Sequence, residues 1–407
     1  MAPGKNSTGF WQAGHRPTLF AAFLYFDLSF MVWVILGPLG VQIAGDLGLT
    51  PAQKGLMVAT PVLSGALLRI VMGILVDHLK PKLAGAIGQV IVIAALALSW
   101  ALGVHSFQQV LVLGVFLGMA GASFAVALPL ASRWYPPEHQ GTALGIAGAG
   151  NSGTVLAALF APGLAVAFGW DNVIGLAAIP LALVLAAFLV LAKDSPHAPA
   201  PKPLSAYARL LRQPDAWWFM FFYSVTFGGF VGLAASLTIY FHVQYALSPV
   251  VAGYCTAAVV FVGSMVRPIG GAVADRVGGV RALTALYAAA ACAFAAIGAG
   301  LSSIWVALPV FVVGMLALGM GNGSVFQLVP QRFREEIGVM TGLVGAAGGL
   351  GGFYLASSLG LAKQYTGSYG AGFLVFAGLA AMALVCIAGV RRRWRTNWVA
   401  QYGAARV

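Results

Sequence analysis

Long apolar stretches alternate with short polar segments along this chain. The apolar runs are continuous, and each reaches the length of about 20 residues that a helix needs to cross a bilayer. A strand of a membrane barrel would instead alternate apolar and polar positions. Helices and closed barrels are the only structures that satisfy their backbone hydrogen bonds in lipid. The pattern therefore predicts twelve transmembrane helices, at 17–41, 54–77, 83–104, 107–132, 142–168, 172–192, 215–243, 250–274, 282–302, 304–328, 338–362 and 369–390.

Composition supports the same class. Of the 407 residues, 60% are apolar and only 8% are charged, whereas a soluble protein carries about 25% charged residues. This excludes a soluble enzyme, a nucleic-acid-binding domain and a secreted disulfide scaffold. The three cysteines lie inside apolar runs and form no CxxC or Cys/His pair, so neither disulfides nor a zinc site is indicated. We expect an all-α membrane protein that is not an enzyme, with no catalytic residue, metal or other cofactor.

The basic residues predict the orientation. With an even number of spans both termini share one side, and 18 of the 22 Lys and Arg residues fall on that side. Cytoplasmic loops carry such an excess, which predicts a multi-pass protein of the cytoplasmic (inner) membrane with both termini cytoplasmic. The net charge of +12 then reflects topology and contact with anionic membrane lipid rather than binding to nucleic acid.

The chain repeats itself. The longest polar connection, 193–214, divides it into an N-terminal six-helix bundle, 1–192, and a C-terminal six-helix bundle with a basic tail, 215–407. Four patterns recur in the same order at an offset of 197 to 201 residues: Gly65-x3-Arg69-x3-Gly73-x3-Asp77 with Gly263-x3-Arg267-x3-Gly271-x3-Asp275, Gly145-x2-Gly148-Ala149 with Gly342-x2-Gly345-Ala346, Phe26-x3-Phe30 with Tyr223-x3-Phe227, and Gly118…Pro129…Arg133 with Gly319…Pro330…Arg334. This indicates duplication, a plan known from secondary transporters.

The whole chain resembles the major facilitator superfamily. The segment 271–281, Gly-Ala-Val-Ala-Asp-Arg-Val-Gly-Gly-Val-Arg, is similar to the cytoplasmic loop motif of that superfamily, and 73–82 is a weaker copy. The resemblance implies the major facilitator fold, with twelve helices in two pseudo-symmetric bundles. It also implies that Asp77, Asp275 and Arg276 form a cytoplasmic gate that latches helices rather than binding substrate.

Two arginines lie inside spans. A charge at the bilayer centre costs at least ~2.5–3.5 kcal/mol, so Arg69 and Arg267 need a reason to be there. Each precedes an aspartate by eight residues, which puts it roughly 12 Å inward from the cytoplasmic end of its helix. The repeat places the two at matching depth in opposite halves. Facing each other, two planar guanidinium forks would bind a planar anion; alternatively, one of them pairs with a buried acid.

Two spans are rich in glycine, at 145–153 and 342–352. Glycine lets helix backbones approach closely, and close packing alone would explain many of these residues. Their density also predicts a narrow path for a small substrate. Asn151, in the middle of the first run, is a polar amide that either binds an anion or bonds to a neighbouring helix.

Both glycine-rich segments resemble the signature motifs of the nitrate/nitrite porter family of this superfamily. The match at 145–153 is specific, whereas in the second segment Gly348 stands where the first repeat has Asn. The resemblance implies substrate-binding residues Arg69, Arg267, Asn151, Tyr223, Phe227, Phe30 and Phe124, and pore glycines Gly148, Gly150, Gly153, Gly345, Gly348 and Gly349.

Asp27 is the only acidic residue deep in a span. An intramembrane acid is a candidate proton carrier, and a salt bridge to Arg69 or a position nearer the interface is the alternative. If Asp27 carries protons, the protein is a nitrate/proton symporter; if it does not, nitrate/nitrite exchange is expected.

The sequence thus predicts a monomeric secondary transporter that moves nitrate, and also nitrite, by alternating access. A major facilitator transporter for another small or phosphorylated anion is the alternative, although a phosphate monoester usually needs a further Lys or His. A nitrate sensor would need an output domain, and an enzyme would need a nucleophile–base pair or a metal cluster.

Overall fold

The computed structural model describes residues 9–196, 204–333 and 336–402, and these contain helices and no β-strand. The helices are α1 Phe10–Ala13, α2 Arg16–Trp33, α3 Gly40–Asp46, α4 Pro51–Leu79, α5 Pro81–Leu102, α6 Phe107–Gly121, α7 Phe124–Ser132, α8 Pro137–Gly148, the 3-10 helix η1 Ala149–Ser152, α9 Gly153–Phe168, α10 Trp170–Leu191, α11 Leu204–Leu211, α12 Pro214–Tyr245, α13 Pro249–Met265, α14 Arg267–Val277, α15 Gly279–Gly298, α16 Ile304–Arg332, α17 Ile337–Thr366 and α18 Gly370–Tyr402.

Among the described residues, eleven helical segments are long and apolar enough to cross a membrane. They correspond to the predicted spans from the second to the twelfth. The first predicted span, 17–41, is not one continuous helix: α2 has only 18 residues, turns follow over 34–39, and α3 continues from Gly40.

Close packing explains why the first span is interrupted. A Cβ atom on Gly37 would collide with the main-chain carbonyl of Ala235 on α12, so the chain passes directly against another helix backbone at this point. Pro38 follows and has no N–H to donate to a helix. The break therefore follows from a tertiary contact that the hydrophobic pattern does not contain.

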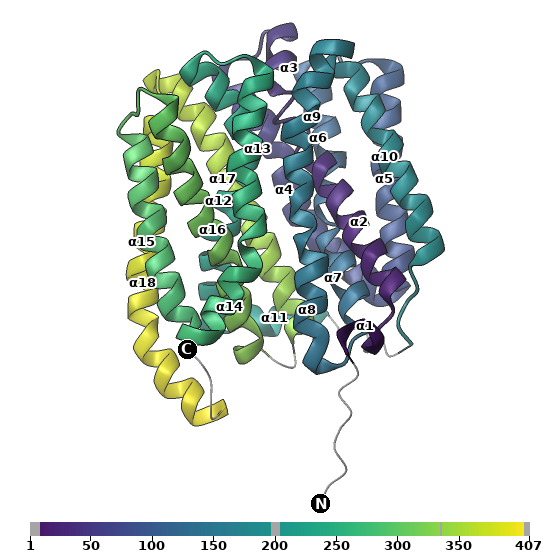
Figure 1. The fold of residues 1–407 in the computed structure, drawn as a ribbon, viewed down its shortest axis with the longest axis vertical. Helices are drawn as coiled ribbons and strands as arrows, with labels where there is room; N and C mark the ends of the chain where they lie inside the picture. The colour runs from purple at the N-terminus through teal and green to yellow at the C-terminus, as the bar shows by residue number, and fades with distance from the viewer. Residues whose placement is uncertain (1–8, 197–203, 334–335, 403–407) are drawn as a thin grey trace, which may run out of the picture.

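Sequence halves separate in space. Helices of the first half, drawn purple to blue, lie on one side of the molecule, and helices of the second half, drawn green to yellow, lie on the other (Figure 1). The terminal helix α1 and the end of α18 lie at the end of the molecule where α8, α11 and α14 are labelled, and α3 lies at the opposite end (Figure 1). The loop end opposite the termini is called the α3 end below.

Glycines hold the two halves together toward the α3 end. A Cβ on Gly55 of α4 would lie 2.8 Å from Cα of Gly360 of α17. On the other side of the molecule, a Cβ on Gly253 of α13 would lie 2.5 Å from the carbonyl oxygen of Ala158 of α9. Such distances leave no room for a side chain, so both seams between the halves are closed here by backbone contact.

The terminal end is packed differently. Gly145 on α8 and its repeat counterpart Gly342 on α17 have open space where a side chain would be, with nothing within 4 Å. Gly145 and Gly342 therefore do not close the seams toward the terminal end as Gly55 and Gly253 do toward the α3 end.

Part of the predicted connection between the halves is helical. Within 193–214, α11 packs against α12 and α17, and Arg209 pairs with Glu336 at 3.2 Å. The remainder of this connection, 197–203, lies outside the described residues, as do Lys5, Lys202, Arg334 and Arg406 of the predicted basic set.

Candidate functional site

Three predicted spans are interrupted next to predicted site residues. α6 stops at Gly121 before α7 begins at Phe124, η1 separates α8 from α9 around Asn151, and α13 stops one residue before Arg267 begins α14. Helix ends leave carbonyl groups without an intrahelical partner. Such irregular backbone at membrane depth is tolerated where it is buried in protein or lines a cavity, so the breaks supply polar main-chain groups in an apolar region.

The Arg69 side chain is fully buried, with 1% of its surface exposed. Its Nη1 donates to the carbonyl of Gly345 on α17 at 2.7 Å, and its Nη2 donates to the carbonyl of Gly121 on α6 at 2.9 Å. Its Nε is buried and has no hydrogen-bond partner among the described residues. Neutral carbonyls hold this guanidinium to both halves of the chain, so its positive charge is not cancelled.

Aromatic rings surround the same guanidinium. Its central carbon lies 5.7, 5.0 and 5.5 Å from the ring centroids of Trp33, Phe124 and Phe227, respectively. A cation over an aromatic face is stabilised by the ring quadrupole, more strongly when both are desolvated. These three rings stabilise the buried charge and also wall it off from larger molecules.

Arg267 reaches the same place from the other half. Its guanidinium carbon lies 6.0 Å from the Phe124 centroid and 5.5 Å from that of Phe326 on α16. Phe124 thus lies next to both cations, and the two arginines interact electrostatically. The Nη1 of Arg267 is buried and has no hydrogen-bond partner in the described structure. The structure therefore brings the two arginines together, and each retains a buried N–H donor without a partner among the described residues.

No acid neutralises either arginine within the described residues, where the ion pairs involve other residues. Asp27, the candidate for a bridge to Arg69, instead accepts a hydrogen bond at 2.6 Å from Ser152 Oγ. It is buried, with 6% of its surface exposed. The pairing alternative receives no support, and the site carries an excess of positive charge.

Tyr223 and Phe227 form one wall. Their rings stack at 5.1 Å with an interplanar angle of 3°, and the Phe326 ring meets Tyr223 edge-on at 5.0 Å. The Tyr223 hydroxyl is buried without a partner in strict hydrogen-bond geometry among the described residues, but it lies close enough to Arg267 to interact with it as a side-chain hydrogen bond and interacts electrostatically with both arginines. It is a polar group beside two cations, which suits an anion ligand.

Two aromatic residues at the site were not predicted, and one predicted residue lies farther away. Phe30 packs against Phe26 at 4.3 Å and Trp33 at 4.7 Å, and it is Trp33, one turn later on α2, that faces Arg69. Phe326 was missed because the repeat offset of 201 aligns Phe124 with Val325, one residue away. A search for aromatic residues within one position of each repeat match would have found it.

Asn151 lies in η1, between the halves. Its carbonyl accepts from Thr154 at 2.8 Å, and Ser264 of α13 donates to it at 3.5 Å. Ser264 precedes Arg267 by three residues. The side chain of Asn151 is buried, and its Oδ1 has no partner in the described part of the chain. Asn151 therefore lies against the end of α13, directly before the helix that carries Arg267, and its side-chain oxygen is not used in a bond between helices in the described structure.

The glycines of α17 lie against the site itself. A Cβ on Gly345 would lie 3.0 Å from Arg69 Cδ, and one on Gly348 would lie 2.7 Å from Tyr223 and 2.8 Å from Phe227. A Cβ on the next residue, Gly349, would lie 2.6 Å from that of Ala66 on α4. Side chains here would displace the arginine, the aromatic wall or the seam between α4 and α17.

The glycines around η1 lie against α2. A Cβ on Gly150 would lie 2.6 Å from the Phe26 ring, and one on Gly153 would overlap the carbonyl oxygen of Asp27. Gly148 is different, because its nearest neighbour would be Leu128 at 4.0 Å. Gly150 and Gly153 thus serve close helix packing, and that packing brings Ser152 to Asp27.

The predicted gate residues lie away from the arginines. Asp77, at the end of α4, pairs with Arg133 at 3.1 Å and interacts electrostatically with Tyr207 of α11; burial and the charge of Asp77 raise the pKa of this tyrosine. Asp275 also interacts with a partner, and Arg276 is exposed. None of them contacts the arginine pair in the described structure, which fits a latch rather than a substrate ligand.

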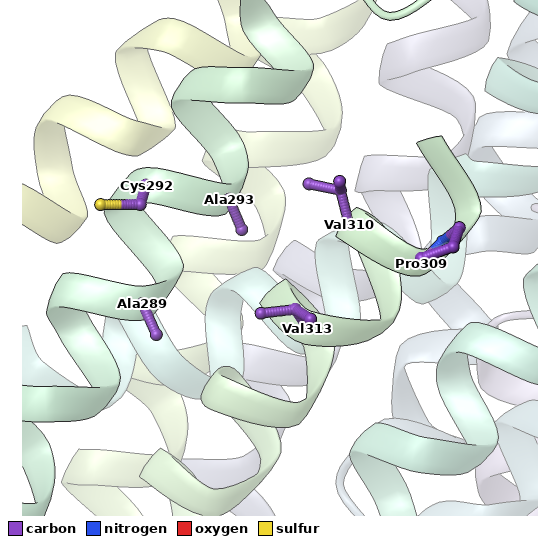
Figure 2. Close-up of a pocket in the computed structure, with 6 residues that line it drawn as sticks. All are labelled: Ala289, Cys292, Ala293, Pro309, Val310 and Val313. Carbon is purple, nitrogen blue, oxygen red and sulfur yellow. The ribbon is translucent and has the colours of Figure 1, made fainter. Parts of the chain in front are cut away.

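An apolar groove is present elsewhere, between α15 and α16 (Figure 2). It has a volume of about 410 Å³ and is lined by Ala289, Cys292, Ala293, Pro309, Val310 and Val313. These residues offer no charge and no strong hydrogen-bond donor, so the groove does not compete with the arginine pair as an anion site.

Comparison with known proteins gives a consistent result. The family described as Major Facilitator Superfamily matches residues 19–356. A "Probable nitrate/nitrite transporter NarK2" of Mycobacterium tuberculosis is 36% identical over 335 residues, covering 80% of this chain and 84% of that protein. A "Nitrite extrusion protein" of Bacillus subtilis is 32% identical over 368 residues, covering 88% and 90%. A "Probable nitrate/nitrite antiporter NarK1" of Thermus thermophilus is 29% identical, covering 90% and 89%.

Solved structures share the fold at low identity. A bacterial homologue of the human lysosomal transporter Spinster, described as inward-facing and unoccupied, superposes with a TM-score of 0.67 at 18% identity, covering 91% of this chain and 95% of that chain. The human organic anion transporter MFSD10 gives a TM-score of 0.68 at 17% identity, covering 92% and 99%. These likenesses confirm the predicted fold class.

Proposed function

Because this chain belongs to the nitrate/nitrite porter family of the major facilitator superfamily, a family of multi-pass membrane transporters and not of enzymes, we propose that it transports nitrate, and also nitrite, across the cytoplasmic membrane. The observation that carries the proposal is the pair of buried arginines without a counter-charge, Arg69 and Arg267, next to one aromatic ring. Relatives named as nitrate or nitrite transporters support the choice of anion.

The chemistry of the site favours a small planar anion. Guanidinium forks bind planar oxyanions in their own plane, and the flanking rings of Phe124, Phe227 and Phe326 leave flat, apolar walls on either side. A phosphate monoester carries more charge and a tetrahedral head group, and the groups found beside the arginines among the described residues are carbonyls, aromatic rings and the Tyr223 hydroxyl, with no lysine or histidine. Another small planar anion, such as nitrite, fits the same walls.

We propose alternating access between the bundles 1–192 and 215–407, with both termini cytoplasmic and the protein acting as a monomer. The closed glycine seams toward the α3 end and the bare glycines toward the terminal end support a site that is reached here from the terminal side. Asp77, Asp275 and Arg276 would then close that side when the bundles rock.

The function is tested with purified protein in proteoliposomes. Nitrate influx is measured with and without an inward proton gradient, and with and without internal nitrite. We expect saturable nitrate influx that requires one of the two driving conditions. Influx driven by internal phosphate esters but not by nitrite or protons would instead favour the phosphorylated-anion alternative, and equal fluxes in protein-free liposomes would reject transport.

Asp27 decides between symport and exchange. Symport requires that nitrate binding favour proton binding to Asp27. Asp27 bonds to Ser152 of η1, the helix that also carries Asn151, so this coupling would pass through η1 rather than through a direct contact between Asp27 and an arginine. We expect Asp27→Asn to abolish the several-fold stimulation of influx by a pH gradient while nitrate/nitrate exchange continues. Gln89→Leu, at a buried polar residue of α5, is a control for loss of a buried polar group. If wild-type influx ignores the pH gradient and follows internal nitrite, Asp27 is a structural partner of Ser152 and exchange is the mechanism.

A further inference from the structure

The two halves place equivalent helices beside the two arginines. A Cβ on Gly118 of α6 would lie 2.6 Å from the nitrogen of Gly65 on α4, and one on Gly319 of α16 would lie 2.9 Å from Cα of Gly263 on α13. Gly65 and Gly263 are repeat counterparts, and so are Gly118 and Gly319. α16 thus crosses α13 as α6 crosses α4, in the register of the 201-residue offset, which makes Asn322 the counterpart of Gly121.

In the first half, the residue at this position, Gly121, binds the arginine through its main-chain carbonyl. The carbonyl of Gly121 accepts from Arg69 Nη2 at 2.9 Å. Gly121 has no side chain because Trp33 fills that space: a Cβ here would lie 2.7 Å from Trp33 Cδ2. The arginine is therefore held on one edge by an acceptor on α6.

In the second half the same space is filled differently. Phe230 is the counterpart of Trp33, and it lies against Gly263 (3.1 Å to a Cβ there) as Trp33 lies against Gly65 (2.8 Å). Phenylalanine is smaller than tryptophan, and Asn322 stands where the first half has glycine. The size difference leaves room for the asparagine side chain beside the arginine of this half.

Asn322 and Arg267 carry complementary groups that lack partners. Asn322 is buried, with 1% of its surface exposed, and its Oδ1 has no hydrogen-bond partner among the described residues. Arg267 Nη1 is a buried donor in the same condition. The residues around Asn322 lie against Arg267: a Cβ on Gly323 would collide with its carbonyl oxygen, and Phe326 is in contact with its guanidinium. A buried acceptor and a buried donor on neighbouring segments each lose a bond to water, and each can replace it by bonding to the other.

We propose that Asn322 is a positioning residue for Arg267: its side-chain oxygen accepts from the guanidinium when an anion binds, as the Gly121 carbonyl accepts from Arg69. With one edge of the fork fixed, the opposite edge presents its two N–H groups to the anion. This inference rests on the proposed anion-binding function of the two arginines. On this inference, the polar side chain of Asn322 serves the substrate site and does not merely fill space between α12 and α16.

The test compares Asn322→Leu, which keeps a similar volume without an acceptor, with Thr238→Val as a matched control. Thr238 is a buried polar residue of α12 that bonds to Thr256 and lies outside the site. Nitrate binding is measured as the rise of the melting temperature of purified protein, and KM is measured in proteoliposomes. We expect Asn322→Leu to raise the half-saturating nitrate concentration and KM about 10-fold, the scale of one hydrogen bond to a charged group, with the control within twofold of wild type.

Asn322→Asp adds a measurement whose result would not change if Asn322 only filled space. Its carboxylate has the shape of the asparagine amide but would pair with Arg267 and cancel its charge. The half-saturating nitrate concentration should therefore rise further than in Asn322→Leu, whereas a residue that only fills space would tolerate this change of nearly equal shape. This variant decides the question if the leucine variant does not fold.

The outcomes separate the two proposals. If wild-type protein responds to nitrate and Asn322→Leu or Asn322→Asp responds equally, Asn322 only fills space and the inference is overturned. If wild type responds to neither nitrate nor nitrite, chloride or formate, the anion site itself fails, and this inference with it.

Discussion

Nitrate transport should fall about 10-fold or more when either Arg69 or Arg267 is replaced by lysine. Lysine keeps the charge but has a single ammonium group in place of a planar fork. Arg69 uses two nitrogens at once, toward Gly345 on α17 and Gly121 on α6, and one ammonium cannot reproduce contacts with two helices together with an anion. Loss of one hydrogen bond to a charged group is by itself on the order of 10-fold or more.

The measurement is initial nitrate influx into proteoliposomes at matched protein content. Arg281→Lys is the control, because Arg281 is exposed at the start of α15 and lies outside the site. Near-normal influx through a well-inserted Arg69→Lys or Arg267→Lys variant would remove the two-arginine site from the mechanism.

Turnover should stop when Gly349 is replaced by leucine. A first side-chain carbon there would already lie 2.6 Å from Ala66 Cβ and 3.1 Å from its Cα, so a leucine forces α17 away from α4 at the level of the arginines. Gly150→Leu should act in the same way against Phe26 on α2. The Gly349 variant loses the close approach between the two halves, and the Gly150 variant loses the close approach of η1 to α2 within the first half.

The readout is counterflow of labelled nitrate, which needs repeated conformational change and no net driving force. Gly378→Leu is the matched control, because Gly378 is exposed on α18 with nothing within 4 Å of a Cβ. If Gly349→Leu and Gly150→Leu both exchange nitrate at the wild-type rate, these glycines are not required for the conformational change.

The sequence was sufficient to predict the central feature because of the repeat. Arg69 and Arg267 occupy the same position of a motif that recurs in both halves. The eight residues from each arginine to the following aspartate, with the rise of a helix, predict its depth in the membrane. Tyr223 and Phe227 were expected at the site from the family resemblance, and the structure stacks their rings beside the arginines; a spacing of four residues puts both rings on one helix face.

Other features depend on contacts between distant segments and were not predicted. The hydrophobic pattern of 17–41 gives no sign that Gly37 touches Ala235 and ends the helix early. The helix breaks near Gly121, Asn151 and Arg267 also leave no sign in the hydrophobic pattern, since apolar residues continue through them. Trp33 and Phe326 were missed for a related reason: which aromatic residue of a helix faces a cation depends on rotation, and the breaks change that rotation.

The carbonyl of Gly345 has a consequence for affinity. In this structure one N–H group of Arg69 Nη1 already donates to an acceptor on α17, so an anion that takes this N–H group must displace the carbonyl. The binding free energy through this group is then the difference between two acceptors rather than the full strength of a contact with a free guanidinium. Such a difference is small, which favours a loosely held anion and fast release. The same hydrogen bond ties α4 to α17, so an anion that takes this N–H group also detaches the two helices at Arg69.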